Sequence, residues 1–241
     1  MLSGKPDMDD NTIELFKKIE LLDSLSDEEL REISVAFIIK KVNKNELVLN
    51  EEDTNNVMYM VLSGELKVVQ TSTAGNEIIL AMHGAGQFFG EISLIDGKTS
   101  PAAVISARES VIAFISKEDF FGLIGKHEKI RDKLLQIMCI RLRDSWEKIR
   151  LLTMKDPAER IKALFLGFCR SSEKSSPQGT VLKQKLTHHD IAGMTGLTRE
   201  TVTRILKKWQ NSGKITVLEK RFIRLNSGFM RDLKSDRTDL G

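Results

Sequence analysis

Three charged side chains at the start of one predicted helix have the chemistry needed to contact base edges in a DNA groove. Arg199 and Arg204 carry guanidinium groups that can donate two parallel hydrogen bonds to guanine O6 and N7, and Glu200 can accept one from cytosine N4. An ordinary solvated helix with an i,i+4 pair between Glu200 and Arg204 is the alternative interpretation. The candidate DNA-binding residues are Thr198, Arg199, Glu200, Thr203, Arg204 and Lys207.

A helix-turn-helix predicted over residues 188–213 would position these side chains. Thr187 and Asp190 have the spacing of a capping box at the start of the first helix. Gly196 supplies the backbone freedom that the tight turn needs, and Thr198 can cap the second helix. Because these signals agree at one spacing, they predict a helix that presents its first turns to a DNA groove.

The charge of the chain is distributed unevenly. Residues 157–241 contain 17 Lys and Arg against 8 Asp and Glu, whereas residues 1–156 contain 20 against 26. A basic block that coincides with a helix-turn-helix is the pattern expected of a surface that binds phosphates. Double-stranded DNA is therefore the predicted partner.

The run Gly196-Leu197-Thr198-Arg199-Glu200-Thr201-Val202-Thr203-Arg204-Ile205-Leu206 resembles the recognition helix of the Crp/Fnr family of bacterial transcription regulators, in its Crp branch. The resemblance extends from about Thr12 to Leu225. It implies a homodimer that reads an inverted repeat with TGTGA-like half-sites, with RNA polymerase as a protein partner. Thr203 stands where that family has a small residue, which leaves the outer bases of the half-site open.

The sequence between residues 35 and 116 predicts many short strands without helices between them. The β-rich runs are VAFIIKKV, VMYMVLSG, ELKVVQTS, NEIILAMH, AAVISA and SVIAFISK. Such a pattern favours a double-sheet jelly roll, preceded by short helices over residues 11–34 that include a capping box at Ser26 and Glu29. We expect an α+β protein with three parts: a domain at 11–128 that the resemblance identifies as a cyclic-nucleotide-binding-like sensor domain, a dimerisation helix at 129–155 and a winged helix-turn-helix at 156–228.

The long helix predicted from Lys129 to Met154 has apolar residues at alternating spacings of three and four. This spacing is typical of the seam of a two-stranded coiled coil and predicts a parallel homodimer. The predicted dimer interface consists of Leu135, Met138, Leu142, Ser145, Ile149 and Leu152. Leu134, Ile137 and Trp146 lie off the seam, where we expect them to pack on the β-roll.

Capping chemistry predicts a new helix after the dimerisation helix. In Asp156-Pro157-Ala158-Glu159, Asp caps the helix, Pro takes its first position and Glu completes a capping box. The run SSEKSSPQGT then predicts a flexible loop, and ITVLEKRFIRLN predicts a β-hairpin wing that turns near Glu219 and Lys220. The polar tail from Ser227 is expected to fray.

Within the resemblance, Phe88-Phe89-Gly90-Glu91-Ile92-Ser93-Leu94 is similar to the nucleotide-binding cassette of the family. Cyclic-AMP-binding members use its Glu for the ribose and a following Arg for the phosphate, and alignment places Ser100 at the position of that Arg. A hydroxyl cannot replace a bidentate guanidinium, which argues against cyclic-AMP binding of the usual kind. The effector-binding candidates are Gly90, Glu91, Ser100, Ser145 and Trp146.

Few residues could support another sensor chemistry. Two cysteines, Cys139 and Cys169, are too few for a four-cysteine iron–sulfur cluster, and each is expected to be a small buried apolar side chain. His83 could ligate a haem, but a polar surface role is the expected one. We therefore predict no metal site, and the cofactor and the small-molecule effector stay unknown.

Three function classes differ in what they require of the sequence. A cupin-like enzyme would need several His and carboxylate ligands, whereas residues 35–116 contain only His83, so neither an enzyme nor catalytic residues are predicted. A cyclic-nucleotide-dependent regulator and a constitutive DNA binder remain the alternatives to control by another effector. No apolar run approaches the ~20 residues of a membrane helix, and a cytoplasmic protein without a membrane partner is expected.

Overall fold

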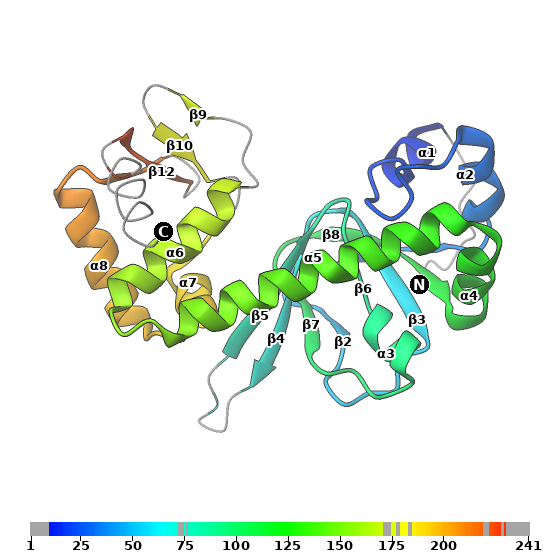
Figure 1. The fold of residues 1–241 in the computed structure, drawn as a ribbon, viewed down its shortest axis with the longest axis horizontal. Helices are drawn as coiled ribbons and strands as arrows, with labels where there is room; N and C mark the ends of the chain where they lie inside the picture. Colours follow the sequence, from blue (N-terminus) through cyan, green and yellow to red (C-terminus); the bar gives the residue numbers. More distant parts are fainter. Residues whose placement is uncertain are drawn as a thin grey trace. The chain divides into compact units, whose positions relative to one another are not determined.

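The computed structural model describes residues 10–71, 75, 77–170, 175–176, 179–182, 185–218, 222–227 and 229. The chain divides into two compact units, residues 1–143 and 144–241, and the division falls inside the long helix α5 (Glu128–Thr153). Figure 1 labels the elements of both units. The boundary between these two units lies within the predicted dimerisation helix, so it does not test the three-domain division expected from the sequence. That division stays a prediction.

The strands described in the N-terminal unit form two four-stranded antiparallel sheets, which confirms the predicted double-sheet roll. In hydrogen-bonded order, the first sheet contains β1 (Ile38–Val42), β8 (Ser110–Ser116), β3 (Val57–Ser63) and β6 (Phe88–Phe89). The second contains β2 (Leu47–Leu49), β7 (Ala103–Ser106), β4 (Glu65–Thr71) and β5 (Glu77–Gly84). The six β-rich runs of the sequence correspond to β1, β3, β4, β5, β7 and β8. β2 and β6 were not predicted, because three and two residues are too short to show a period.

Strand β3 has two buried faces, and each belongs to a different core. Met58 and Met60 pack with the helices of the unit, whereas Val61 packs between the sheets with Phe89 and Val104. Successive side chains of a strand point to opposite faces, so a strand buried on both sides has a continuous apolar sequence. The VMYMVLS run of β3 therefore reflects its place between the helices and the interior of the roll.

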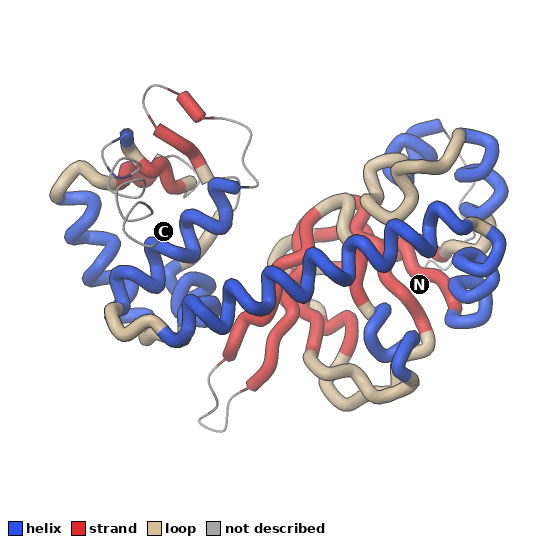
Figure 2. Tube along the Cα trace, in the orientation of Figure 1, coloured by secondary structure: helices blue, strands red, loops and turns tan. Residues whose placement is uncertain are grey.

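Short helices complete the N-terminal unit. They are α1 (Asp10–Phe16), α2 (Asp27–Ser34), α3 (Glu91–Asp96), α4 (Lys117–Lys126) and the first part of α5. The capping box predicted at the start of α2 is present, because the Ser26 hydroxyl accepts from the Glu29 amide while the Glu29 carboxylate accepts from the Ser26 amide. The first part of α5 runs along the strands in Figures 1 and 2.

Two predictions for α5 are confirmed and two are wrong. Leu134 and Ile137 are buried in the helix-facing core, as expected. Trp146, expected on the β-roll, is instead 59 % exposed, and Cys139, expected to be buried, is also exposed. The buried stripe of α5 is narrower than its apolar content suggests, and Trp146 and Cys139 lie outside that stripe.

In the C-terminal unit, the last part of α5 is followed by three described helices and a small antiparallel sheet (Figure 2). The helices are α6 (Pro157–Arg170), α7 (His188–Thr195) and α8 (Arg199–Asn211). The sheet contains β11 (Ile215–Val217), β12 (Ile223–Leu225), β10 (Gly179–Val181) and β9 (Ser175–Ser176), in that order. The predicted wing is confirmed as the β11–β12 pair, whereas its turn near 219–220 lies outside the described residues.

Three details of this unit test the predictions further. The start of α6 is capped as expected at Asp156, which accepts from the Ala158 amide at 2.9 Å. The segment predicted to be a loop contains β9 and β10, and Gly179 has a φ of 122° where a Cβ would overlap the Leu225 carbonyl oxygen. The prediction of a fraying tail from Ser227 is wrong for Phe229, whose ring is buried and 5.1 Å from that of Trp209.

Candidate functional site

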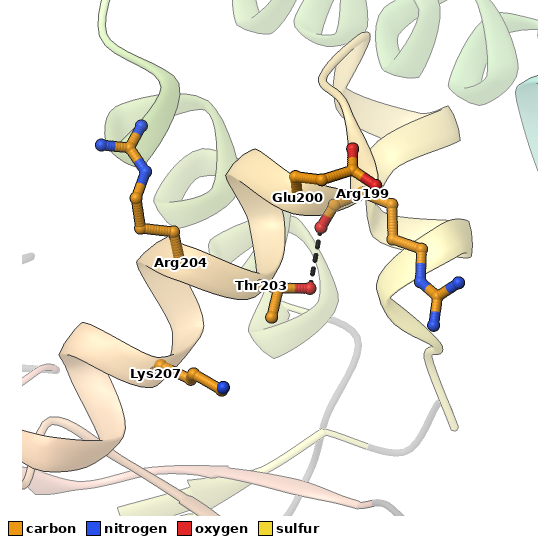
Figure 3. A pocket seen from close by; sticks show the side chains of 5 residues that line it. All are labelled: Arg199, Glu200, Thr203, Arg204 and Lys207. Atoms are coloured by element: carbon orange, nitrogen blue, oxygen red, sulfur yellow. Dashed lines mark hydrogen bonds between the residues drawn. The ribbon is translucent and has the colours of Figure 1, made fainter.

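The exposed face of α8 gathers five side chains around a shallow, open depression (Figure 3). They are Arg199, Glu200, Thr203, Arg204 and Lys207, all of which are candidate DNA-binding residues. The sixth candidate, Thr198, caps the helix through its hydroxyl, which accepts from the Thr201 amide. The structure therefore brings the predicted residues together on one surface.

Helix packing fixes the orientation of this surface. Val202, Leu206 and Trp209 are buried on the opposite side of α8, so the charged positions between them face outward. The turn into α8 is made by Gly196 with a φ of 63°, and the predicted capping box of Thr187 on α7 is present. The local signals of the sequence thus form the expected helix-turn-helix.

The charged groups of the face are not paired with one another. Among the described residues, Arg199, Glu200, Arg204 and Lys207 form no ion pair, and Figure 3 shows Glu200 and Arg204 pointing apart. The alternative of a solvated helix held by a Glu200–Arg204 pair is therefore not supported. Two guanidinium groups, one ammonium group and one carboxylate remain accessible to a ligand.

A second contact joins the two helices of the motif at the same face. The Thr203 hydroxyl donates to the Arg199 carbonyl oxygen at 2.8 Å, and the His188 imidazole Nδ1 lies 2.8 Å from the same hydroxyl oxygen. His188 is the first residue of α7 and was not predicted from the sequence. Its spacing of fifteen residues from Thr203 gives no periodic signal, because the contact depends on how the helices cross.

Arg160 fixes the other end of α7. Its guanidinium donates to the Met154 carbonyl oxygen at 2.7 Å and to the Thr195 carbonyl oxygen at 3.3 Å. The last carbonyl groups of a helix have no intrahelical partner, and a cation there is favourable. Arg160 therefore joins α6 to the helix-turn-helix and supports the orientation of α8.

The predicted cassette of the N-terminal unit lies where β6 meets α3. Gly90 adopts a φ of 90°, and a Cβ at this position would lie 3.0 Å from Asn55 Nδ2 and from the Val57 carbonyl oxygen. Asn55 Nδ2 also donates to the Gly90 carbonyl oxygen at 3.0 Å. Only glycine combines this φ with so close an approach, and the turn directs Glu91 into the interior, where it is buried.

Arg141 of α5 is the principal partner of Glu91. Its Nη1 lies 2.8 Å from Glu91 Oε1, while Nη2 donates to the Phe88 carbonyl oxygen at 2.7 Å and lies 3.4 Å from Glu20 Oε1. The guanidinium carbon also lies 4.3 Å from the centroid of the Phe88 ring. The sequence contained a signal for Arg141, because it follows the buried Ile137 by four residues on the same face of the helix.

Burial determines the ionisation of this cluster. It raises the pKa of Glu91 and of Glu20, and the Arg141 guanidinium opposes both shifts. It also lowers the pKa of His83 from 6.5 to about 3, with a smaller contribution from Arg141. His83 is therefore neutral near pH 7, whereas the charges of Glu91 and Arg141 stabilise each other.

The expectation that His83 is a polar surface group is wrong. His83 is 8 % exposed, its ring stacks 5.9 Å from that of Phe89, and Nδ1 is buried without a hydrogen-bond partner among the described residues. In β5 the residue faces the interior of the roll, so the period-two pattern of the strand determines its burial.

Ser100 is buried, and its polar groups are engaged within the chain. Its hydroxyl donates to the Ala102 carbonyl oxygen at 2.8 Å, and its amide donates to the Asp53 carbonyl oxygen at 2.9 Å. The position therefore supplies neither a cation nor an unused hydroxyl proton. Ser145 and Trp146 are exposed on α5 in the C-terminal unit, and their part in an effector site stays a prediction.

The residues of the predicted dimer interface are largely uncovered. Leu135, Leu142 and Ile149 are 60 %, 53 % and 61 % exposed, and Leu152 is 39 % exposed. Ser145 is also exposed, whereas Met138 is half-buried against the core of the N-terminal unit. Such a stripe of apolar side chains is unfavourable in water unless another surface covers it.

The described residues support neither a metal site nor a membrane-spanning helix. No group of three or more His, Cys, Asp or Glu side chains within them could hold a metal ion. In the same part of the chain, no helix is both long and apolar enough to cross a membrane. Cys169 is half-buried, and burial raises the pKa of its thiol, which makes the thiolate less accessible.

Family profiles match both units. The cyclic nucleotide-binding domain matches residues 39–127, and the Crp-like helix-turn-helix domain matches residues 159–227. The chain is 31 % identical over 174 residues to the cAMP-activated global transcriptional regulator CRP of Haemophilus influenzae, covering 71 % of this chain and 76 % of that protein. It is 26 % identical over 211 residues to the fumarate and nitrate reduction regulatory protein of Vibrio cholerae, covering 87 % of this chain and 84 % of that protein.

A comparison of structures gives the same result for the fold. The structure of a CooA mutant from Carboxydothermus hydrogenoformans has a TM-score of 0.75, covers 90 % of this chain and 93 % of its own, and is 20 % identical in sequence. At this identity the likeness establishes the fold alone.

Proposed function

Because this chain belongs to the Crp/Fnr family of bacterial transcription regulators, we propose that it acts as a homodimer on an inverted DNA repeat with TGTGA-like half-sites. In this proposal the N-terminal unit binds an effector that controls DNA binding. The relatives are transcription regulators rather than enzymes, and we infer the same for this chain.

The observation that carries the proposal is the uncovered charged face of α8. Arg199 and Arg204 lie on this face and have the hydrogen-bond donors to contact the two guanines of a TGTGA half-site, and Glu200 suits the cytosine paired with the inner one. None of these groups is held by an ion pair with another described residue, so no ion pair within that part of the chain has to break before DNA binds. Lys207, one turn further along, suits a backbone phosphate.

The uncovered stripe on α5 supports the proposed dimerisation. A second copy of the same helix would cover Leu135, Leu142 and Ile149 in a two-fold interface. Two recognition helices would then contact half-sites one DNA turn apart, ~34 Å. An inverted repeat in DNA has the same two-fold symmetry. Family membership supports RNA polymerase as a protein partner.

For the effector, we propose a molecule other than cyclic AMP bound in the usual way. Ser100 supplies no cation and donates its proton to the Ala102 carbonyl oxygen, while Glu91 is paired with Arg141. A cyclic phosphate would therefore lack the guanidinium that the resemblance places at position 100. A cyclic-nucleotide-dependent regulator is the second candidate, because the profile match at 39–127 and the cAMP-activated relative of H. influenzae favour it.

Binding-site selection from random DNA with the full-length chain tests the DNA proposal, at fixed salt because phosphate contacts make affinity salt-dependent. We expect an inverted repeat to be enriched. Arg204→Ala should weaken binding by ~1–3 kcal/mol and relax selection at one guanine per half-site. Lys207→Ala, the matched control on the same face, should weaken binding to all sequences alike. A selected motif without two-fold symmetry, or one unchanged by Arg204→Ala, would contradict the proposal.

A further inference from the structure

Thr203 lies at the centre of the α8 face, between Arg199 and Lys207, which are one helical turn away on either side (Figure 3). Its side chain has a hydroxyl and a methyl group on the same carbon. Since the rotamer that places one also places the other, contacts of the hydroxyl determine where the methyl points.

The hydroxyl is engaged within the protein on both sides. The Arg199 carbonyl oxygen and the His188 Nδ1 each lie 2.8 Å from the hydroxyl oxygen. The single hydroxyl proton is donated to the carbonyl oxygen when Nδ1 carries a proton, and to Nδ1 when it does not. The Thr203 hydroxyl therefore has no proton left for an acceptor on DNA. Figure 3 shows its oxygen turned to the Arg199 carbonyl and its methyl carbon directed away from that bond, on the side of Lys207.

We propose that Thr203 is a specificity-determining residue whose γ-methyl contacts the C5-methyl group of a thymine, and that His188 is the positioning residue that holds it there. In the major groove the thymine methyl is the apolar feature that distinguishes this base, and the methyl of Thr is one of the groups that contact it. The inference rests on the proposed function, since it assumes that α8 enters the major groove, and it adds an apolar reader to the charged ones.

A DNA probe that differs by a single methyl group tests this proposal. The probe is a synthetic duplex of the selected repeat in which one thymine per half-site is replaced by deoxyuridine, position by position, and affinity is measured by fluorescence anisotropy. Replacement of one particular thymine should lower the affinity for the duplex about fourfold per half-site, which corresponds to the loss of one buried methyl group. All other thymine positions should show a smaller change.

Two substitutions at Thr203 separate the methyl from the hydroxyl. Thr203→Ser keeps the hydroxyl and removes the methyl, so it should abolish the deoxyuridine effect at that position. Thr203→Val has the shape of threonine, keeps a methyl and has a stiff χ1, so it should retain the effect. An effect that survives Thr203→Ser, or one that disappears in Thr203→Val, would overturn the role of the methyl.

A double-mutant cycle tests the positioning role of His188. His188→Ala should reduce the deoxyuridine effect in the Thr203 protein but leave it unchanged in the Thr203→Val protein, where no hydroxyl needs to be held. Equal reductions in both backgrounds would show that His188 acts on the fold of the motif and would overturn the positioning role.

Arg204→Ala distinguishes failure of this inference from failure of the proposed function. It should change selection at a guanine and leave the deoxyuridine effect intact. If an inverted repeat is selected and responds to Arg204→Ala but no thymine methyl matters, only the Thr203 inference fails. If no repeat is selected, both fail.

Discussion

Leu142 is the residue at which the proposed dimer can be tested most directly. It lies in the middle of the apolar stripe on α5 and is 53 % exposed in one copy of the chain. If a second copy covers the stripe, Leu142 meets its own counterpart across the two-fold axis. Leu142→Glu would then place two like charges at the centre of the interface.

The size of the effect follows from the exposed fraction. Fully burying a leucine side chain contributes about 1.5–3 kcal/mol, so the uncovered half of Leu142 contributes about 1 kcal/mol per copy and about 2 kcal/mol per dimer. Burying two unpaired carboxylates adds an unfavourable free energy of several kcal/mol. We therefore expect Leu142→Glu to weaken dimerisation at least about a thousandfold.

Sedimentation velocity at micromolar concentration measures the outcome, with binding to the selected repeat as a second observable. Ile140→Glu is the matched control, because Ile140 is on the same helix and 56 % exposed but lies off the seam. Leu142→Glu should be monomeric and lose specific DNA binding, whereas Ile140→Glu should remain dimeric. A dimeric Leu142→Glu protein, or equal dissociation of both variants, would refute the seam.

The remaining predictions concern the N-terminal unit. Titration calorimetry should show weak or no binding of cyclic AMP, because Ser100 supplies no cation; sub-micromolar affinity would contradict this. Arg141→Met leaves the buried Glu91 without its ion-pair partner and should destabilise the unit by about 3–5 kcal/mol in urea unfolding, with partial recovery in the Arg141→Met/Glu91→Gln double variant. The pKa of His83 is about 3 in the folded state and 6.5 in the unfolded state, so the unfolded chain binds the proton first and stability falls as the pH drops below about 6.5. Between pH 7 and pH 4.5 the wild type should lose about 2–3 kcal/mol more than His83→Leu; equal losses would show that another group is responsible.

The elements that the sequence predicted correctly depend on local chemistry. The capping boxes at Ser26 and Thr187 and the left-handed turn at Gly196 involve residues three or four apart, so their spacing is visible in one dimension. The same holds for the outward face of α8, because the buried Val202 and Leu206 define the opposite side. The DNA-reading candidates could therefore be placed on one surface before any tertiary contact was known.

The features that the sequence did not predict depend on contacts between distant segments. Glu91 and Arg141 are fifty residues apart, and their ion pair forms because α5 packs on the roll beside α3. His83 is an exception, because the period-two pattern of its own strand directs it inward although the side chain is polar. Phe229 packs on Trp209 from a polar tail, where neither period nor propensity indicates a core residue.

Helix α5 shows how sequence and structure together support the proposed dimer. Its sequence contains more apolar residues than one face can hold, which indicates two covered faces without saying what covers each. The structure assigns one face, because Leu134 and Ile137 are buried in the core of the N-terminal unit. The face with Leu142 and Ile149 is left uncovered within one chain. Since an identical helix offers the same heptad spacing, a second copy of α5 is the partner that fits it best.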